Sequence, residues 1–442
     1  MTSLSDSQEL TQVGPGTVMG NFMREYWIPA AKASELEADG APVRLSLLGE
    51  KLIAFRDSSG RVGVMDHRCP HRCASLFLGR NEDNGIRCTY HGWKFDVNGN
   101  CVDMPNLPPE QDFKEKVHAK AYPTVERNGL IWVYLGARKD APPLPALETT
   151  LLPEEDIEIT FILRDCNWLQ ALEGDIDTSH FGFLHVGHIE PEDVPDGHPY
   201  SRTVNDRAPQ FVVEDMPWGT SYGAYRENQP GETYWRIANF IFPFWTQQPQ
   251  GRFSHHVHAR AWVPLDDNHT MFVYVSWING AASNTRARPP LRNGKHATLR
   301  TKHEYAPTTT DWFGRWRLAA NEANDWRIDR TSQRDGSFYS GIDNIHLQDQ
   351  AVTESMGPIT DHDFEHLAPS DRMITQTRRR CLLAARNFRD AGAPAPGVDD
   401  TECLYKARSG FFVADDAASF TDAFDEQLST AVRAAPFPQA AE

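Results

Sequence analysis

Two pairs of cysteine and histidine lie close together in the chain, and they restrict its possible folds more than any other feature. The first pair is Cys69 and His71, with one residue between them, and the second is Cys88 and His91, with two. Sixteen residues separate the pairs. Each pair is short enough to sit on one tight loop, so two loops that face each other would bring all four side chains together.

The chemistry of these four side chains suits two kinds of metal centre. Two thiolates and two imidazoles bind either a zinc ion or a Rieske [2Fe–2S] cluster, in which the cysteines hold one iron and the histidines the other. Zinc fingers usually separate their paired cysteines from their paired histidines, whereas each loop here supplies one ligand of each type. The arrangement therefore favours the iron–sulfur cluster over zinc.

The composition indicates an acidic protein with a large core. The 442 residues correspond to two or three domains of ~100–200 residues each. Lysine and arginine total 44 and aspartate and glutamate total 61, which gives a net charge of −17. This balance argues against nucleic acid or an anionic membrane as the partner, because either needs a basic face. No uncharged apolar stretch approaches ~18 residues, so no membrane span is expected.

The cysteine content and the N-terminal sequence predict the cellular compartment of the protein. Seven cysteines are an odd number and do not suggest a disulfide scaffold. Outside the two metal-binding pairs, Cys73 and Cys101 are expected to be buried free thiols. The N-terminus lacks the basic start and the apolar stretch of a secretory signal. Together these features predict a cytoplasmic protein.

Two regions of different character follow one another along the chain. From 43 to 140, short β segments with frequent turns predict an all-β domain, with a hairpin signal at Asn98-Gly99. Four prolines between 139 and 153 predict a linker. From 141 to 442, strand-like alternation, including a strand at 157–163, gives way to helical periodicity from 300 onward. The second domain is therefore expected to be α+β, with an antiparallel sheet flanked by helices, and the first 42 residues are expected to pack on it.

A second group of possible metal ligands lies between residues 177 and 188. A helix is expected over 167–186, and 100° per residue would place His180 and His185 about 140° apart on it, with Asp177 between them. That separation is wide for one metal, so we expect the helix to be distorted, or to end, between the two histidines. His188 shares a face with His185, so the spacing alone leaves the choice of histidines open.

Two histidines need a carboxylate to complete a facial triad that leaves coordination positions open for O₂. The segment 341–359 offers Asp343, Asp349 and Glu354. The spacing of these residues does not choose among them.

Both groups of residues carry a resemblance to a known family. The pattern C-P-H-R-x(15)-C-x-Y-H-G-W-x-F resembles the Rieske domain of ring-hydroxylating oxygenases, and N-W-x-Q-x-x-E-G-x-x-D-x-x-H-x(4)-H resembles their mononuclear iron motif. The resemblance implies that His180 and His185 bind Fe(II), that Asp349 is the third ligand, and that His188 lies outside the site. It also implies a helix-grip catalytic domain, in which Asp177 passes electrons from the Rieske cluster of a neighbouring subunit.

The resemblance carries further expectations about partners and assembly. The stretch QDQAVTESMGPI at 348–359 is similar to the phthalate dioxygenase-like group. Members of this family receive electrons from a separate reductase that contains flavin and an iron–sulfur centre and oxidises NADH. Transfer between subunits implies a trimer or stacked trimers that form a hexamer. The implied reaction is cis-dihydroxylation of a phthalate-like aromatic carboxylate with O₂. The alternatives are O-demethylation or monohydroxylation of an aryl ether, or a Rieske electron carrier without oxygenase chemistry.

A substrate carboxylate requires a cation at one end of an apolar pocket, preferably an arginine. Arg236 lies in an otherwise apolar strand, where an unpaired charge costs free energy, and it is the preferred candidate. Arg207 is the second, ahead of Arg202 and Arg226. The phthalate dioxygenase-like group tends to carry an arginine where this chain has Gln210, which weakens the match to phthalate itself.

Overall fold

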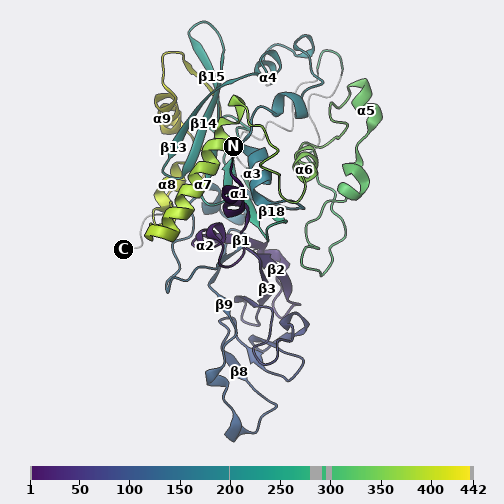
Figure 1. The fold of residues 1–442 in the computed structure, drawn as a ribbon, viewed down its shortest axis with the longest axis vertical. Coiled ribbons are helices and arrows are strands. Elements are labelled where there is room, and N and C mark those ends of the chain that lie inside the picture. Colours follow the sequence, from purple (N-terminus) through teal and green to yellow (C-terminus); the bar gives the residue numbers. More distant parts are fainter. Residues whose placement is uncertain (1, 199, 279–290, 295–300, 439–442) are drawn as a thin grey trace.

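The predicted β segments form two small antiparallel sheets in the narrow lower part of the molecule (Figure 1). The computed structural model describes residues 2–198, 200–278, 291–294 and 301–438. The Asn98-Gly99 turn connects β7 to β8 as predicted, and Gly99 has the positive φ of 86° that this turn requires. One sheet has the order β2 (Val43–Leu47), β3 (Glu50–Arg56), β4 (Val62–Asp66), β9 (Ala121–Tyr122); the other has the order β5 (Arg80–Glu82), β6 (Gly85–Arg87), β7 (Lys94–Phe95), β8 (Cys101–Asp103).

A three-stranded sheet connects the N-terminal segment to the end of this β region. β1 (Trp27–Lys32) pairs with β11 (Leu130–Tyr134), which also pairs with β10 (Thr124–Arg127). The helices α1 (Leu4–Thr11) and α2 (Val18–Met23) instead pack against α7 (Arg372–Ala391) of the upper body. We therefore propose that the first 42 residues belong with the second domain through these two helices.

A large antiparallel sheet forms the centre of the upper body and confirms the predicted α+β class. The strand expected at 157–163 is its first edge strand. The order is β12 (Ile157–Arg164), β18 (Thr270–Trp277), β17 (His258–Pro264), β16 (Trp245–Gln247), β15 (Glu232–Ile241), β14 (Gly219–Glu227), β13 (Gln210–Met216), with β19 (Gly410–Asp415) also paired to β15.

The helix that leads to the two histidines and the helix that carries Asp349 both begin at asparagines, as their sequences favour. Asn167 accepts a hydrogen bond from the backbone N–H of Leu169 at the start of α3 (Trp168–Ile176). Asn344 caps α6 (Ile345–Ser355) in the same way. The remaining α-helices are α4 (Ser201–Asn205), α5 (Arg330–Asp335), α8 (Thr401–Lys406) and α9 (Phe420–Thr430). None of the described helices is long and apolar enough to span a membrane.

The expectation of helix from residue 300 onward is wrong in two places. Residues 301–329 contain only a short 3₁₀ segment at Glu322–Arg327 and a β-bridge between Tyr305 and Leu318. Pro307 and the β-branched threonines that follow it disfavour a helix there. Near the C-terminus, β19 adds a strand to the sheet because its apolar side chains alternate between buried and more exposed positions.

A buried arginine ties α3 to α7. The Arg378 guanidinium donates to both carboxylate oxygens of Glu173 (2.5 and 2.7 Å) and also to Glu365. Arg378 is 4% exposed and Glu173 is 7% exposed, so both charges have left bulk water and depend on each other. This contact fixes the helix that leads into the candidate site.

Replacing Arg378 with methionine should lower the free energy of unfolding by about 3 to 5 kcal/mol, because Glu173 would remain buried without its partner. Urea denaturation followed by tryptophan fluorescence measures the loss. Arg389→Met on the same helix is the control, since its pairs with Asp390 and Glu9 are half-exposed and should contribute less than about 1 kcal/mol. Equal losses for the two variants would contradict the role of Arg378.

Candidate functional site

The predicted long helix at 167–186 ends early and restarts in a different form. α3 ends at Ile176, Asp177 follows as its C-cap, and residues Phe181–His185 form a single π-helical turn. The α-helix thus ends before His180, and the expected distortion between the two histidines is this π turn. Because a π turn contains more residues than an α turn, it brings His180 and His185 onto the same side, which an α-helix would not do.

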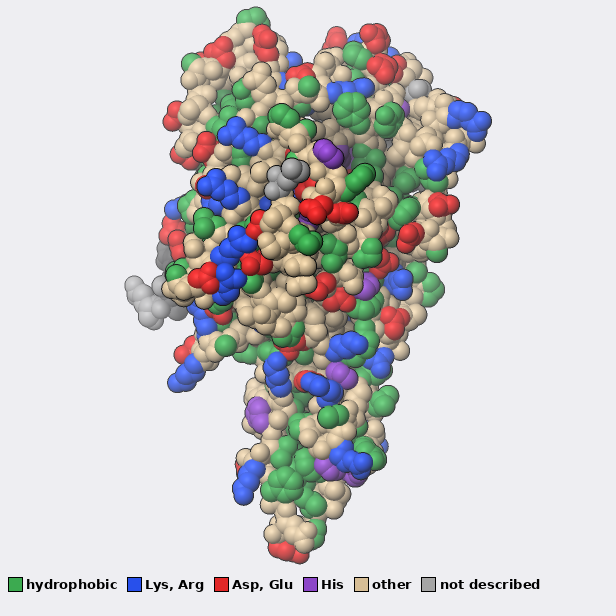
Figure 2. Space-filling view, viewed as in Figure 1, with side chains coloured by type: hydrophobic (Ala, Val, Ile, Leu, Met, Phe, Trp, Pro, Cys, Tyr) green, Lys and Arg blue, Asp and Glu red, His purple; other side chains and the backbone are tan. Residues whose placement is uncertain are grey.

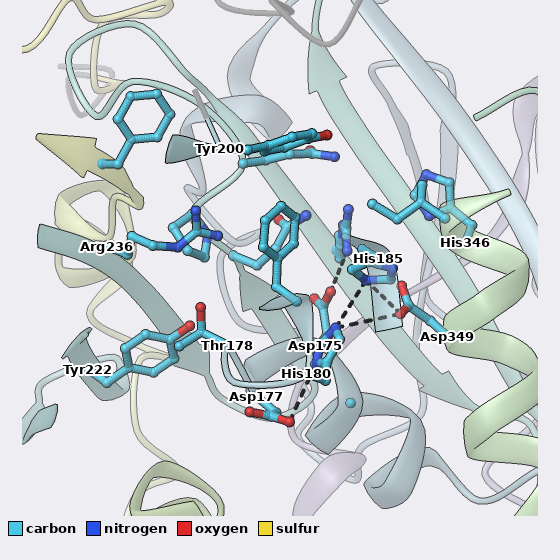
Figure 3. A pocket seen from close by; sticks show the side chains of 18 of the residues that line it. Asp175, Asp177, Thr178, His180, His185, Tyr200, Tyr222, Arg236, His346 and Asp349 are labelled. Carbon is cyan, nitrogen blue, oxygen red and sulfur yellow. Dashed lines mark hydrogen bonds and ion pairs between the residues drawn. The ribbon is translucent and has the colours of Figure 1, made fainter. Parts of the chain in front are cut away.

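Three side chains predicted as iron ligands converge at this point (Figure 3). The Nε2 atoms of His180 and His185 are 3.1 Å apart, and Asp349 Oδ1 lies 3.6 Å from the first and 3.1 Å from the second. Donor atoms that share one ion at ~2.1 Å and near right angles are separated by about 3 Å. These three are the only such group of His, Cys, Asp or Glu side chains in the described parts of the chain.

The charges around the three side chains favour a cation between them. Burial raises the pKa of Asp349, but His185 and His180 outweigh this effect and hold it well below its usual range. Burial lowers the pKa of His180, but Asp177 and Asp349 raise it above its ordinary value. Asp177 Oδ2 lies 3.4 Å from His180 Nδ1, on the side of the ring that faces away from Asp349.

The two alternative carboxylates do not reach this point. Glu354 points to the other side of α6, where it accepts hydrogen bonds from the Asp165 backbone N–H and the Trp326 indole. Asp343 precedes α6 and is absent from the convergent group. Among the three candidates, only Asp349 faces both histidines.

A cavity extends from the histidines to Arg236 (Figure 3). The Arg236 guanidinium lies 5.0 Å from the centre of the Phe181 ring. Within the described residues it makes no hydrogen bond or ion pair. Beside it, the buried Tyr222 hydroxyl lies next to Thr178. This end of the cavity therefore offers an unpaired cation and hydroxyl donors.

The other arginines near the cavity are already paired or lie outside it. Arg260 also lines the cavity, but it forms a buried ion pair with Asp175. Arg207, the second predicted candidate, is not a lining residue and donates to the Ile189 carbonyl. Arg202 donates to the Asn228 carbonyl. Burial and the nearby Arg236 lower the pKa of Arg226 to about 10, and Arg226 donates to the Asp206 carbonyl.

The first Cys/His group lies on two loops of matching geometry. The carbonyl oxygen of Cys69 accepts from the backbone N–H of Cys73, and that of Cys88 accepts from Gly92, each at 2.9 Å. Both cysteines are buried. The rings of His71 and His91 lie side by side, with centres 4.4 Å apart.

Two details show that these loops fit a cluster. His91 Nδ1 is buried and has no hydrogen-bond partner in the described chain, as expected of an atom that faces a metal. Gly92 has a φ of 80°, and a Cβ there would lie 2.6 Å from the Pro105 ring. Any larger residue at this position would clash with Pro105, so the close contact between the second loop and Pro105 requires glycine.

The prediction that Cys73 is buried is wrong, whereas Cys101 is buried as expected. Cys73 occupies the same loop position as Gly92 and has a φ of 59°. This left-handed turn directs its side chain into solvent.

The hydroxyl groups near Arg236 were not predicted from the sequence. Thr178 lies inside the Asp-x-x-His motif, and this position was the available signal. Tyr222 lies on β14, about forty residues further along, and nothing in the local sequence distinguishes it. Only the pairing of β14 with β15 brings it next to the strand of Arg236.

Comparisons with known proteins agree with this arrangement. Residues 26–123 match the Rieske [2Fe–2S] domain family, and residues 133–409 match the LigXa C-terminal domain-like family. The chain is 49% identical to the 3-chlorobenzoate-3,4-dioxygenase oxygenase subunit of Comamonas testosteroni, covering 98% of this chain and 100% of that one. It is 35% identical to the phthalate 4,5-dioxygenase oxygenase subunit of Pseudomonas putida, covering 88% of each. The structure of NdmA from P. putida CBB5, a QL mutant with theobromine, has the same fold, with a TM-score of 0.54 at 19% identity over 91% of this chain and 100% of that one.

Proposed function

The chain belongs to the Rieske-type ring-hydroxylating oxygenases, and we propose that it is the oxygenase component that cis-dihydroxylates an aromatic monocarboxylate with O₂. Electrons come from a separate reductase that contains flavin and an iron–sulfur centre and oxidises NADH. The observation that carries the substrate class is the unpaired Arg236 at one end of the cavity that contains His180, His185 and Asp349.

The ligand sets for both metal centres are part of this proposal. Cys69, His71, Cys88 and His91 hold the [2Fe–2S] cluster, and the buried, unpartnered His91 Nδ1 supports this role. His180, His185 and Asp349 hold Fe(II), which their mutual distances support. When bound, the cluster supplies single electrons, and the mononuclear iron is the centre at which O₂ reacts with the ring.

The cavity favours a substrate with one carboxylate rather than the two of phthalate. Arg236 is the unpaired guanidinium of the described lining, whereas Asp175 neutralises Arg260. A second carboxylate would therefore lose its hydration without gaining a cation. Tyr222 and Thr178 can donate to the same carboxylate as Arg236. These contacts hold the acid group at one end of the cavity and direct the ring toward His180 and His185.

Replacing Arg236 with methionine should lower kcat/KM for a benzoate substrate about 100-fold, on the order of 3 kcal/mol, because the carboxylate loses its charged partner. The loss should appear mainly in KM, measured by O₂ uptake with the purified reductase. Arg202→Met, which alters an arginine outside the cavity, is the control and should leave KM within about threefold. An unchanged KM in R236M would remove Arg236 from the substrate site.

Electron transfer through Asp177 is proposed to occur between subunits of a trimer or of stacked trimers. The sheet β5–β8, which the cluster loops precede and connect, lies at the far end of the molecule from α3 and α6 (Figure 1). Asp177 lies beside His180, and its side chain is 24% exposed. A cluster from a second subunit can therefore approach the histidines more closely than the cluster of the same chain.

Exposed apolar side chains at both ends support this assembly. Near the cluster loops, Leu78, Tyr90 and Phe113 are 64%, 55% and 42% exposed, and the narrow β region appears at the bottom of Figure 2. Near the end of α6, Met356 and Phe364 are 46% and 80% exposed. Apolar side chains gathered on a surface mark a contact with another protein, and here a second copy of the chain is the proposed partner.

A visible spectrum with a metal count tests the proposed cofactors. The purified protein should be red-brown, should bleach on reduction with dithionite, and should contain about three irons and two sulfides per chain. A colourless protein that contains zinc would contradict the proposal. The loaded enzyme should then consume O₂ with chlorobenzoates but not with phthalate. Release of formaldehyde from methoxybenzoates, without any diol from chlorobenzoates, would instead identify an O-demethylase.

A further inference from the structure

A glutamine lies behind one of the two histidines of the proposed iron site. Gln348 Oε1 is 2.7 Å from His185 Nδ1, on the side of the ring that faces away from Asp349. Both side chains are buried, with exposures of 1% for Gln348 and 4% for His185. Gln348 precedes Asp349 on α6, so one helix supplies both the carboxylate and this hydrogen-bond partner.

The surroundings of Gln348 determine which way its amide points. Its Nε2 lies 2.8 Å from the Ile342 carbonyl oxygen and 2.8 Å from Ser340 Oγ. A carbonyl oxygen can only accept, so the amide NH₂ must face Ile342. The amide oxygen then faces His185, and His185 Nδ1 must carry the proton and donate it. The lone pair of a neutral His185 is thereby placed on Nε2, the atom that faces His180 and Asp349.

A tight turn holds the two groups that orient the amide. Gly341 lies between Ser340 and Ile342 and has a φ of 75°. A Cβ at this position would lie 2.7 Å from the Asp329 carbonyl oxygen. The turn therefore depends on glycine, and it directs the Ser340 hydroxyl and the Ile342 carbonyl toward the same amide.

The two histidines consequently face different polar groups at Nδ1. His180 Nδ1 faces the carboxylate of Asp177 at 3.4 Å, whereas His185 Nδ1 faces a neutral amide at 2.7 Å. We propose that Gln348 is a positioning residue that fixes the ring orientation and the tautomer of His185 for metal binding. This inference rests on the proposed iron site and adds a residue that does not itself touch the metal.

A metal titration of the full chain tests the proposal. The mononuclear iron is removed with a chelator, the cluster is retained, and Co(II) is added anaerobically in competition with a chelating dye. Gln348→Met should weaken Co(II) binding about 10- to 100-fold, as loss of such partners typically does. Gln348→Glu, which keeps an oxygen facing Nδ1, should recover part of this loss. Gln350→Met is the matched control, because this buried glutamine on the same helix bonds Glu354 instead of a histidine.

Proton NMR of the Co(II) protein separates positioning from a general loss of structure. The unaltered protein should show a shifted, slowly exchanging N–H proton from His185, and Gln348→Met should lose this signal while that of His180 remains. Equal Co(II) affinity in Gln348→Met and the unaltered protein would overturn the inference, and so would equal weakening in Gln350→Met. Failure of the unaltered protein to bind Co(II) would instead overturn the proposed iron site.

Discussion

Replacing Asp349 with alanine should reduce the iron content from about three atoms per chain to about two and abolish oxygenase activity. Asp349 supplies the only carboxylate in the described group that includes both histidines, and without it the site retains two neutral ligands and no negative charge. The cluster should be unaffected, because its loops lie in the separate β region. Iron and sulfide analysis, together with the visible spectrum of the same sample, distinguishes the two losses.

Asp343→Ala is the matched control for this experiment. Asp343 is the neighbouring carboxylate that the spacing alone left open, and it precedes α6. This variant should keep about three irons and its activity. A full iron content in Asp349→Ala, or loss of one iron in Asp343→Ala, would show that Asp349 has been misassigned as the ligand.

A mixture of two inactive variants should regain activity if electrons pass between subunits. Asp349→Ala keeps the cluster but lacks the mononuclear iron, and Cys88→Ala keeps the iron but lacks the cluster. When the two variants are produced together in equal amounts and assemble at random in a ring, about a quarter of the sites combine an intact iron site with a neighbouring cluster. Activity should therefore rise from the background to about a quarter of that of unaltered protein treated in the same way.

The position of Asp177 in this mixture identifies the subunit in which it acts. Asp177→Asn should abolish the recovered activity when it is placed in the chain with the intact iron site. It should have no effect in the chain that supplies the cluster. If the mixture stays inactive although sedimentation shows mixed assemblies, electron transfer occurs within one chain and the assembly proposal fails.

The amino-acid sequence predicted local features of this fold and site well. The two Cys/His pairs are short loops, and their ligand types follow directly from the residues. The first strand of the large sheet and the Asn98-Gly99 turn are likewise set by nearby residues.

Features that depend on distant contacts could not be predicted in this way. Helical periodicity indicated a distortion between His180 and His185, but it did not give the form of that distortion, a π turn, or the end of the α-helix at Ile176. Arg207 and Arg236 both looked suitable as single residues, and only the folded structure shows that Arg236, and not Arg207, lines the cavity. The choice of Asp349 as third ligand came from the family resemblance. The spacing of the residues in the sequence did not separate it from Asp343 and Glu354.

The left-handed turn at Cys73 makes the protein suitable for measurements of its own assembly. Cys73 is exposed, whereas the other six cysteines are buried. A maleimide spin label should therefore attach at a single position, next to one cluster loop. Pulsed dipolar spectroscopy of such labels would give the spacing between neighbouring loops in solution. The number of coupled spins would count the subunits directly, without a crystal and without turnover.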